Sequence, residues 1–168
     1  HVIERISPQV DELFINANRQ MDEYSDYKLP ILQDKHNGFI GPLAGFYLGL
    51  NEAKHDYVLM APCDSPLLHE HLASTLLKAL IDQDADIAVA KSDGNTHPVF
   101  CLCKKTVLPS LTAYIEKGER KVSTWQKSQN YIEVDFSNPN TEGITEAFVN
   151  LNTVSELETL ASLLNTTP

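Results

Sequence analysis

Short apolar runs alternate with segments of helical spacing along almost the whole chain, and this alternation constrains the fold more than any other feature. Strand-like runs separated by helix-like segments are typical of α/β domains with a mostly parallel sheet. The run at 57–64 is apolar at successive positions, as expected for a strand buried on both faces. Strands are predicted at residues 12–18, 28–34, 57–64, 86–92, 99–104, 131–137 and 147–152.

Helices are predicted from apolar residues at helical spacing and from residues that favour helix starts. Pro42 suits the first turn of a helix that follows Gly41. Ser65 is the expected N-cap of another helix, with Pro66 as its first residue. A capping-box pattern at 153–156 opens the last one. The predicted helices cover residues 1–10, 42–53, 66–83 and 153–164.

Length and charge exclude several classes of protein. With 168 residues, 42% of them hydrophobic, we expect one domain spanning 1–168. A formal charge of −10 disfavours binding to nucleic acid. No apolar run approaches the roughly 20 residues that span a bilayer, so we expect no membrane association. Cys101 and Cys103 lack the second ligand pair of a zinc site; free thiols suit a reducing compartment, and we expect a cytoplasmic protein.

Polar side chains recur where the predicted strands end. In parallel α/β sheets, ligands bind beyond the carboxyl ends of the strands. Amides and carboxylates are typical of such places, although any single polar strand end is also normal in a plain loop. The residues concerned are Asn16, Asn18, Asp34, Asp64, Asn150 and Asn152.

Asp64 carries the most specific chemistry among them. It ends an apolar strand between Pro62 and Pro66, and an isolated buried carboxylate is costly unless it is paired or bound to a metal. Magnesium takes one or two carboxylates together with substrate phosphates, a demand that Asp64 can meet, and Asp34 is the candidate for a second carboxylate. The structural alternative is that Asp64 caps the helix expected near Pro66.

Other residues could bind a ligand, but an ordinary structural role would explain them as well. Gly38, Gly41 and Gly45 around a helix start could let a ligand approach backbone amides, or could form an ordinary turn. Arg19 could clamp a phosphate or lie free on the surface. The pair Arg120–Lys121 could bind an anion or be solvated.

Histidines give a weaker signal. His97 precedes a proline, which favours an extended backbone, and could contact substrate or begin a strand. His69 and His71 are two residues apart on a predicted helix and would not share a face, which argues against a zinc site.

The motifs INANR, GPLAG, PCDSP, THP, GER and FVNLNT, in this order, resemble those of the molybdenum cofactor guanylyltransferases. The resemblance covers essentially the whole chain, and PCDSP followed by FVNLNT is its most specific part. It implies a Rossmann-like three-layer sandwich of the nucleotidyltransferase superfamily. GPLAG and PCD alone would also fit sugar-nucleotide and cytidylyl transferases.

The resemblance implies an enzyme that uses Mg²⁺ to transfer GMP from GTP to molybdenum-molybdopterin, releasing diphosphate. Asn16 and Asp34 would bind the guanine nucleotide, and Asp64 would be the catalytic residue that holds magnesium against the triphosphate. On the pterin side the implied residues are Arg120, Asn150 and Asn152. Contacts with proteins that deliver molybdopterin or mature molybdoenzymes would follow.

One departure from the family pattern leaves alternatives open. The first strand and the glycine-rich loop that the family places around the triphosphate have no counterpart in these residues, so we expect an N-terminally incomplete domain. The alternatives are a related transferase that uses CTP or another nucleotide, and a non-catalytic remnant that binds nucleotide or molybdopterin.

Overall fold

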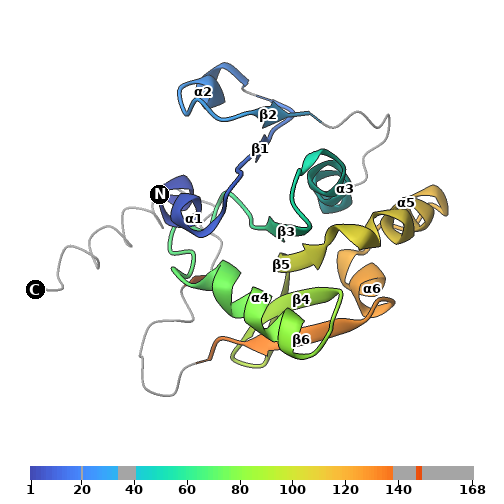
Figure 1. The fold of residues 1–168 in the computed structure, drawn as a ribbon. Coiled ribbons are helices and arrows are strands. Elements are labelled where there is room, and N and C mark those ends of the chain that lie inside the picture. Colours follow the sequence, from blue (N-terminus) through green and yellow to red (C-terminus); the bar gives the residue numbers. More distant parts are fainter. Residues whose placement is uncertain (20, 34–40, 138–146, 149–168) are drawn as a thin grey trace, which may run out of the picture.

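The computed structural model describes residues 1–19, 21–33, 41–137 and 147–148 (Figure 1). Its helices and strands alternate as the sequence predicts. In chain order they are α1 (Val2–Ile6), η1 (Ser7–Gln9), β1 (Ile15–Asn16), α2 (Met21–Ser25), β2 (Ile31–Leu32), α3 (Pro42–Glu52), β3 (Tyr57–Met60), α4 (Leu72–Asp82), β4 (Ile87–Ser92), β5 (Asn95–Lys104), η2 (Lys105–Val107), α5 (Leu108–Glu116), α6 (Val122–Lys127) and β6 (Tyr131–Asp135).

The strands form two hydrogen-bonded groups. β1 and β2 pair in parallel, and a second sheet has the order β3-β5-β4-β6. In that sheet β4 and β6 are parallel, while β5 is antiparallel to both β3 and β4. Strands β3, β4 and β6 therefore run in one direction and β5 runs against them. The prediction of an α/β fold with mostly parallel strands is confirmed.

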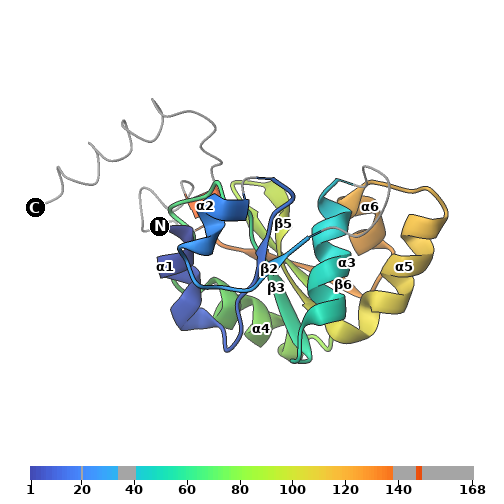
Figure 2. The same cartoon turned by 90° about the horizontal axis from the view of Figure 1, so that it is seen from above.

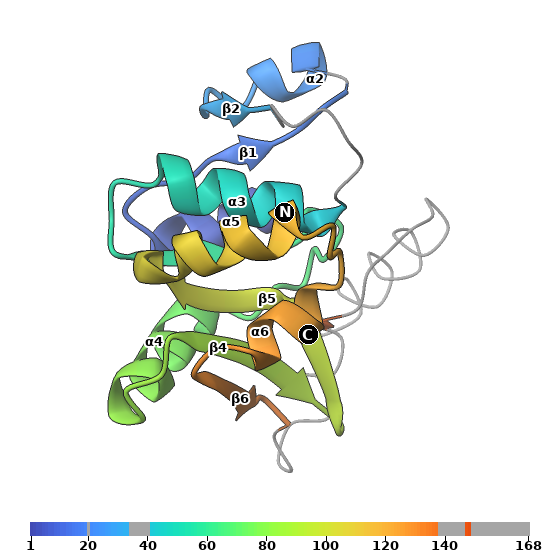
Figure 3. The ribbon, with the colours of Figure 1, turned by 90° about the vertical axis from the view of Figure 1, so that its right-hand side faces the viewer.

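Side chains of the central strands alternate between two hydrophobic clusters, one on each face of the sheet. Ala88 and Ala90 point into the cluster beneath α4, whereas Ile87 and Val89 point into the cluster beneath α3, α5 and α6. Figures 2 and 3 show these helices on their two sides of the sheet. The result is the three-layer arrangement that the sequence predicts, because strands buried on both faces need a helical layer on each.

The predicted start of α4 is wrong. The sequence places Ser65 as N-cap and Pro66 as the first helical residue, but the helix begins at Leu72 after His71. The amide of Ala73 donates to Oε1 of Gln9 at 3.0 Å, so a distant residue caps this helix. Residues 66–71 form turns instead, with the amide of Leu68 bonded to the carbonyl oxygen of Ser65 at 3.1 Å.

Several other boundaries differ from the prediction. The expected strands 12–18 and 28–34 contract to β1 and β2, and the expected helix 1–10 becomes α1 followed by the 3₁₀ turn η1, in which Pro8 lies. Helices α2, α5 and α6 were not predicted. In the predicted strand 147–152, the two described residues, Ala147 and Phe148, are in a 3₁₀ turn. The predicted helix 153–164 lies outside the described residues.

Among the helices in the described ranges, none combines the length and apolar character that crossing a bilayer requires.

Candidate active site at the carboxyl ends of the strands

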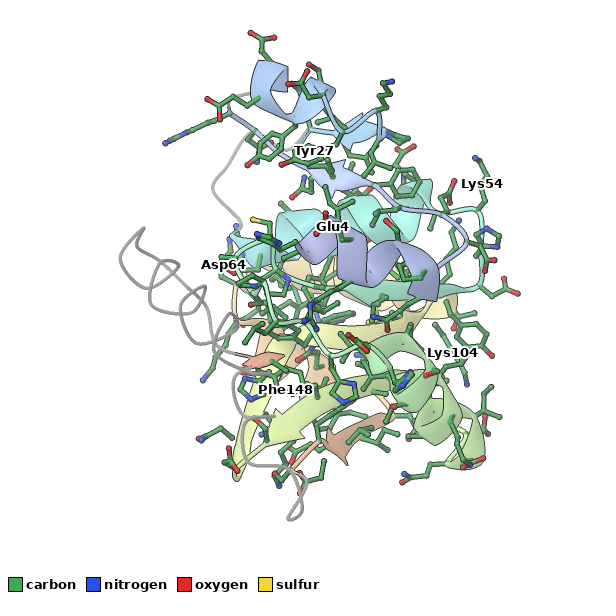
Figure 4. All side chains as sticks on the ribbon, turned by 90° about the vertical axis from the view of Figure 1, so that its left-hand side faces the viewer. Glu4, Tyr27, Lys54, Asp64, Lys104 and Phe148 are labelled. Atoms are coloured by element: carbon green, nitrogen blue, oxygen red, sulfur yellow. The ribbon has the colours of Figure 1, made fainter. Side chains whose placement is uncertain are left out.

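An ion pair joins the segments that lead into β1 and β3, two strands that belong to different sheets. Nζ of Lys54, just before β3, lies 2.9 Å from Oε1 of Glu12, just before β1, and the Lys54 amide donates to Oε2 of Glu12 at 3.0 Å. This pairing lowers the pKa of Glu12 and raises that of Lys54. Figure 4 shows Lys54 and Lys104 at one side of the molecule and Asp64 and Phe148 at the other. The carboxyl end of β3, which leads to Asp64, therefore lies on the side of the molecule opposite Lys54.

Asp64 follows the carboxyl end of β3, in a turn that the fully buried Ser65 continues. Its Oδ1 atom is buried and has no hydrogen-bond partner in the part of the chain that the structure describes. Asp64 does not cap a helix, because the next helix begins only at Leu72. A buried carboxylate oxygen without a protein partner is costly, and a cation at this atom would offset that cost.

Asn16 is the last residue of β1 and its Nδ2 donates to the carbonyl oxygen of Leu32 on β2 at 3.2 Å. The chain enters α3 through Gly41, whose φ of +57° favours glycine. Gly45, in the first turns of α3, faces the side chain of Asn16. Asn16 therefore lies between the end of β2 and the beginning of α3. Asn18 and Arg19, farther along the chain, are exposed.

His97 lies on β5 next to the carboxyl end of β4. Its Nε2 is 2.8 Å from Oγ of Ser92, and its ring stacks on Phe148 with centroids 4.7 Å apart. Burial lowers the pKa of His97 below its ordinary value of 6.5. The sequence left open whether His97 contacts substrate or begins a strand; in the structure it lies within β5 and packs against an aromatic side chain.

Arg120 lies in the turn between α5 and α6, which Figure 3 shows at the side of the sheet where α3 begins. The side chain is exposed, and Nη1 donates to the carbonyl oxygens of Ile115 at 3.2 Å and Glu119 at 2.7 Å. Lys121 is the N-cap residue of α6. The guanidinium is thus held by backbone acceptors and forms no ion pair with a carboxylate among the described residues, which leaves its charge available to an anion.

Four residues singled out from the sequence lie outside the described residues: Asp34, Gly38, Asn150 and Asn152. Their assignments remain predictions. Phe148, two positions before Asn150, is described, and its buried ring packs against His97, Phe100 and Phe136. Phe148 is the single aromatic residue of FVNLNT, and the sequence gave no indication of its partners.

No group of three or more metal-ligating side chains occurs within the described ranges. His71 directly precedes α4 rather than lying within it, so the predicted helical placement of His69 and His71 is wrong, and the argument from helix faces against a zinc site no longer applies. Cys101 and Cys103 are buried free thiols, as predicted, whereas Cys63 is exposed.

The family model described as "MobA-like NTP transferase domain" matches residues 1–131. Two curated relatives named molybdenum cofactor guanylyltransferase are similar over nearly the whole chain. The protein of Shewanella sp. strain MR-4 is 41% identical over 166 residues, which cover 98% of this chain and 81% of the relative. The protein of Shewanella putrefaciens is 40% identical over 162 residues, covering 96% and 80%.

Solved structures share the fold at lower identity. Molybdopterin-guanine dinucleotide biosynthesis protein A from Archaeoglobus fulgidus is 19% identical with a TM-score of 0.76, over 99% of this chain and 84% of that one. A CMP:2-keto-3-deoxy-manno-octonic acid synthetase complexed with CTP is 10% identical with a TM-score of 0.67, over 97% and 87%. At these identities the likeness concerns the fold alone.

Proposed function

This chain belongs to the MobA-like NTP transferase family, and from that premise we propose that it transfers GMP from GTP to molybdenum-molybdopterin, forming the guanine dinucleotide cofactor and releasing diphosphate. The observation that carries the proposal is the buried, unpartnered Oδ1 of Asp64 at the carboxyl end of β3. A nucleotidyltransferase needs a carboxylate at such a position to hold a divalent cation against the nucleotide phosphates.

Mg²⁺ is the cation that this function requires, and Asp64 is the residue that would hold it. One carboxylate is sufficient, because magnesium in nucleotide sites takes most of its other ligands from phosphates and water. When bound, the ion neutralises charge on the triphosphate and on the departing diphosphate. Asp64 is the catalytic residue of the proposal.

Asn16 and Asp34 form the nucleotide side of the proposed site together with Asp64. The carboxamide of Asn16, at the end of β1, offers both a donor and an acceptor to a base or ribose. Its position between β2 and α3 limits the orientations that it can take.

Arg120, Asn150 and Asn152 form the proposed pterin side. Molybdopterin carries a phosphate, and the Arg120 guanidinium, which donates to the backbone carbonyls of Ile115 and Glu119, can turn toward such an anion. Asn152→Asp would place a negative charge beside this phosphate, so we expect weaker molybdopterin binding with GTP binding unchanged. Unaltered cofactor affinity would remove Asn152 from the pterin side.

The terminal phosphate of molybdopterin attacks the α-phosphorus of GTP in line. A bond forms between a phosphate oxygen and the α-phosphorus, while the bond from the α-phosphorus to the bridging oxygen breaks and diphosphate leaves. Such a reaction depends on positioning and charge neutralisation and does not require a covalent bond to the protein. The same proposal places the protein in the cytoplasm, in contact with proteins that supply molybdopterin or receive the product.

The test is diphosphate release by the full-length protein, given Mg²⁺, molybdenum-molybdopterin and each nucleoside triphosphate in turn. We expect release with GTP, and loss of that release with Asp64→Asn. Selective use of CTP would assign the protein to a cytidylyl transfer. Nucleotide binding by calorimetry without any diphosphate release would identify a binding module instead.

A further inference from the structure

Any side chain at position 45, which is glycine in α3, would disturb the side chain of Asn16. A Cβ added at Gly45 would stand 3.1 Å from Oδ1 of Asn16 and 3.8 Å from its Cγ. The shorter distance is closer than such atoms normally approach. The Asn16 side chain therefore fills the space that a residue-45 side chain would need.

Local structure alone does not account for glycine at this position. Unlike Gly41, Gly45 does not have a positive φ, so the backbone there would accept any L residue. Within a helix, glycine is less favourable than alanine by about 1 kcal/mol. The contact with Asn16 is the feature that a methyl group at residue 45 would disturb.

Asn16 is restrained from the other side as well. Its Nδ2 donates to the carbonyl oxygen of Leu32 on β2 at 3.2 Å, while its Oδ1 lies against α3. A methyl group at residue 45 must therefore move Oδ1 away from α3, turn the carboxamide, or weaken the bond to Leu32. Each of these movements changes the direction in which the amide presents its donor and acceptor at the end of β1.

We propose that Gly45 is a positioning residue for nucleotide binding, which fixes the orientation of the Asn16 carboxamide by leaving room for it. This inference rests on the nucleotide role of Asn16 in the proposed function. A misdirected amide loses the hydrogen bond to the nucleotide, whose net contribution corresponds to roughly a three- to tenfold change in affinity. The chemical step on the α-phosphorus does not involve Asn16, so kcat is maintained.

The experiment compares Gly45→Ala with the unmodified full-length protein, measuring the Kd of GTP by calorimetry and kcat and KM by diphosphate release. We expect Kd and KM to rise about three- to tenfold with kcat within about twofold. Gly49→Ala is the matched control, because its Cβ would meet Cε of Met60 at 3.0 Å in the hydrophobic interior. It should change stability but not Kd.

A double-mutant cycle with Asn16→Ala tests whether Gly45 acts through Asn16. Asn16→Ala alone should weaken GTP binding, and adding Gly45→Ala should weaken it no further. The effect of Gly45→Ala on the thermal unfolding midpoint should also change sign. The substitution should lower the midpoint in the unmodified protein, but raise it in the Asn16→Ala variant, where the space is free and alanine favours the helix. This second readout does not depend on turnover.

Three results would overturn the inference. The first is an unchanged Kd for Gly45→Ala, and the second is an equal rise in Kd whether or not Asn16 is present. An Asn16→Ala variant with normal GTP affinity and normal diphosphate release from GTP would also refute it, while leaving the proposed function intact. If instead the nucleotide panel selects CTP, the proposed function fails and the same cycle, run with CTP, still tests the coupling between the two residues.

Discussion

The imidazole of His97 stacks on the ring of Phe148 with centroids 4.7 Å apart and planes inclined by 13°. Phe148 is also edge-on to Phe100 at 5.0 Å and to Phe136 at 5.4 Å. One aromatic side chain thus joins β5 to residues that follow β6, far along the sequence. This contact attaches Phe148 to the sheet.

Phe148→Ala should destabilise the protein by about 3 kcal/mol, because truncating a buried phenylalanine loses its transfer free energy and leaves a cavity. Urea unfolding followed by the fluorescence of Trp125, the single tryptophan, measures the change. Tyr27→Ala, at a side chain that is 55% exposed, should change stability by less than about 0.5 kcal/mol. Equal effects of the two variants would contradict the buried position of Phe148.

Stability should fall as the pH drops below about 6.5, the ordinary pKa of histidine. Burial lowers the pKa of His69 and His97, so the unfolded chain binds more protons than the folded one in this range. Protonation therefore favours unfolding, and the urea midpoint should be lower at pH 5.5 than at pH 7.5.

His97→Gln should reduce that pH dependence, since it removes one of the two groups responsible. A midpoint that falls just as steeply in His97→Gln as in the unmodified protein would show that His97 does not contribute.

Gln9→Ala should cost about 1–2 kcal/mol, although Gln9 lies outside α4. Its Oε1 accepts from the amide of Ala73 near the start of α4, and its Nε2 donates to the carbonyl oxygens of Arg5 and His69. Gln9→Glu keeps the acceptor but loses the donors and should be intermediate. Gln83→Ala, exposed at the other end of α4, is the control, and a similar loss there would refute the capping role.

Of the three cysteines, Cys63 should react rapidly with a thiol reagent in the folded protein, because it alone is exposed. Cys101 and Cys103 are fully buried, and burial raises the pKa of Cys101, which lowers its thiolate fraction. We expect one fast thiol in the native state, all three in urea, and no fast thiol in Cys63→Ser. More than one fast thiol in the native protein would contradict this burial.

Asp64→Asn should remove Mg²⁺-dependent diphosphate release while leaving the urea midpoint unchanged or slightly higher. The neutral side chain no longer binds the cation, yet it also removes the cost of a buried carboxylate oxygen without a partner. Asp22→Asn, at an exposed site on α2, is the matched control for both measurements. Full turnover in Asp64→Asn would exclude Asp64 from the mechanism.

The sequence predicted the features that depend on local pattern. The alternation of apolar runs and helical spacing identified the α/β class, and the polar residue after each run led to Asn16 and Asp64 at strand ends. The helices α5 and α6 were missed although Pro109, at the start of α5, gave a usable signal. The apolar residues of α5 and α6 lie close to strand-like runs, and their helical periodicity is too short to distinguish these helices from strands.

Long-range contacts decided what local pattern could not. The side chain of Gln9 caps the amide of Ala73 at the start of α4, although Gln9 lies 64 residues earlier in the chain. Neither Ser65 nor Asp64 is therefore required as a cap for that helix. The burial of Asp64 Oδ1 and the contact between Asn16 and Gly45 depend on how β1, β3 and α3 pack together. The order of residue types thus determined which elements form and which side chains end them. Only the tertiary structure decided which of those side chains are buried, capped or in contact, because desolvation and packing depend on neighbours brought from elsewhere in the chain.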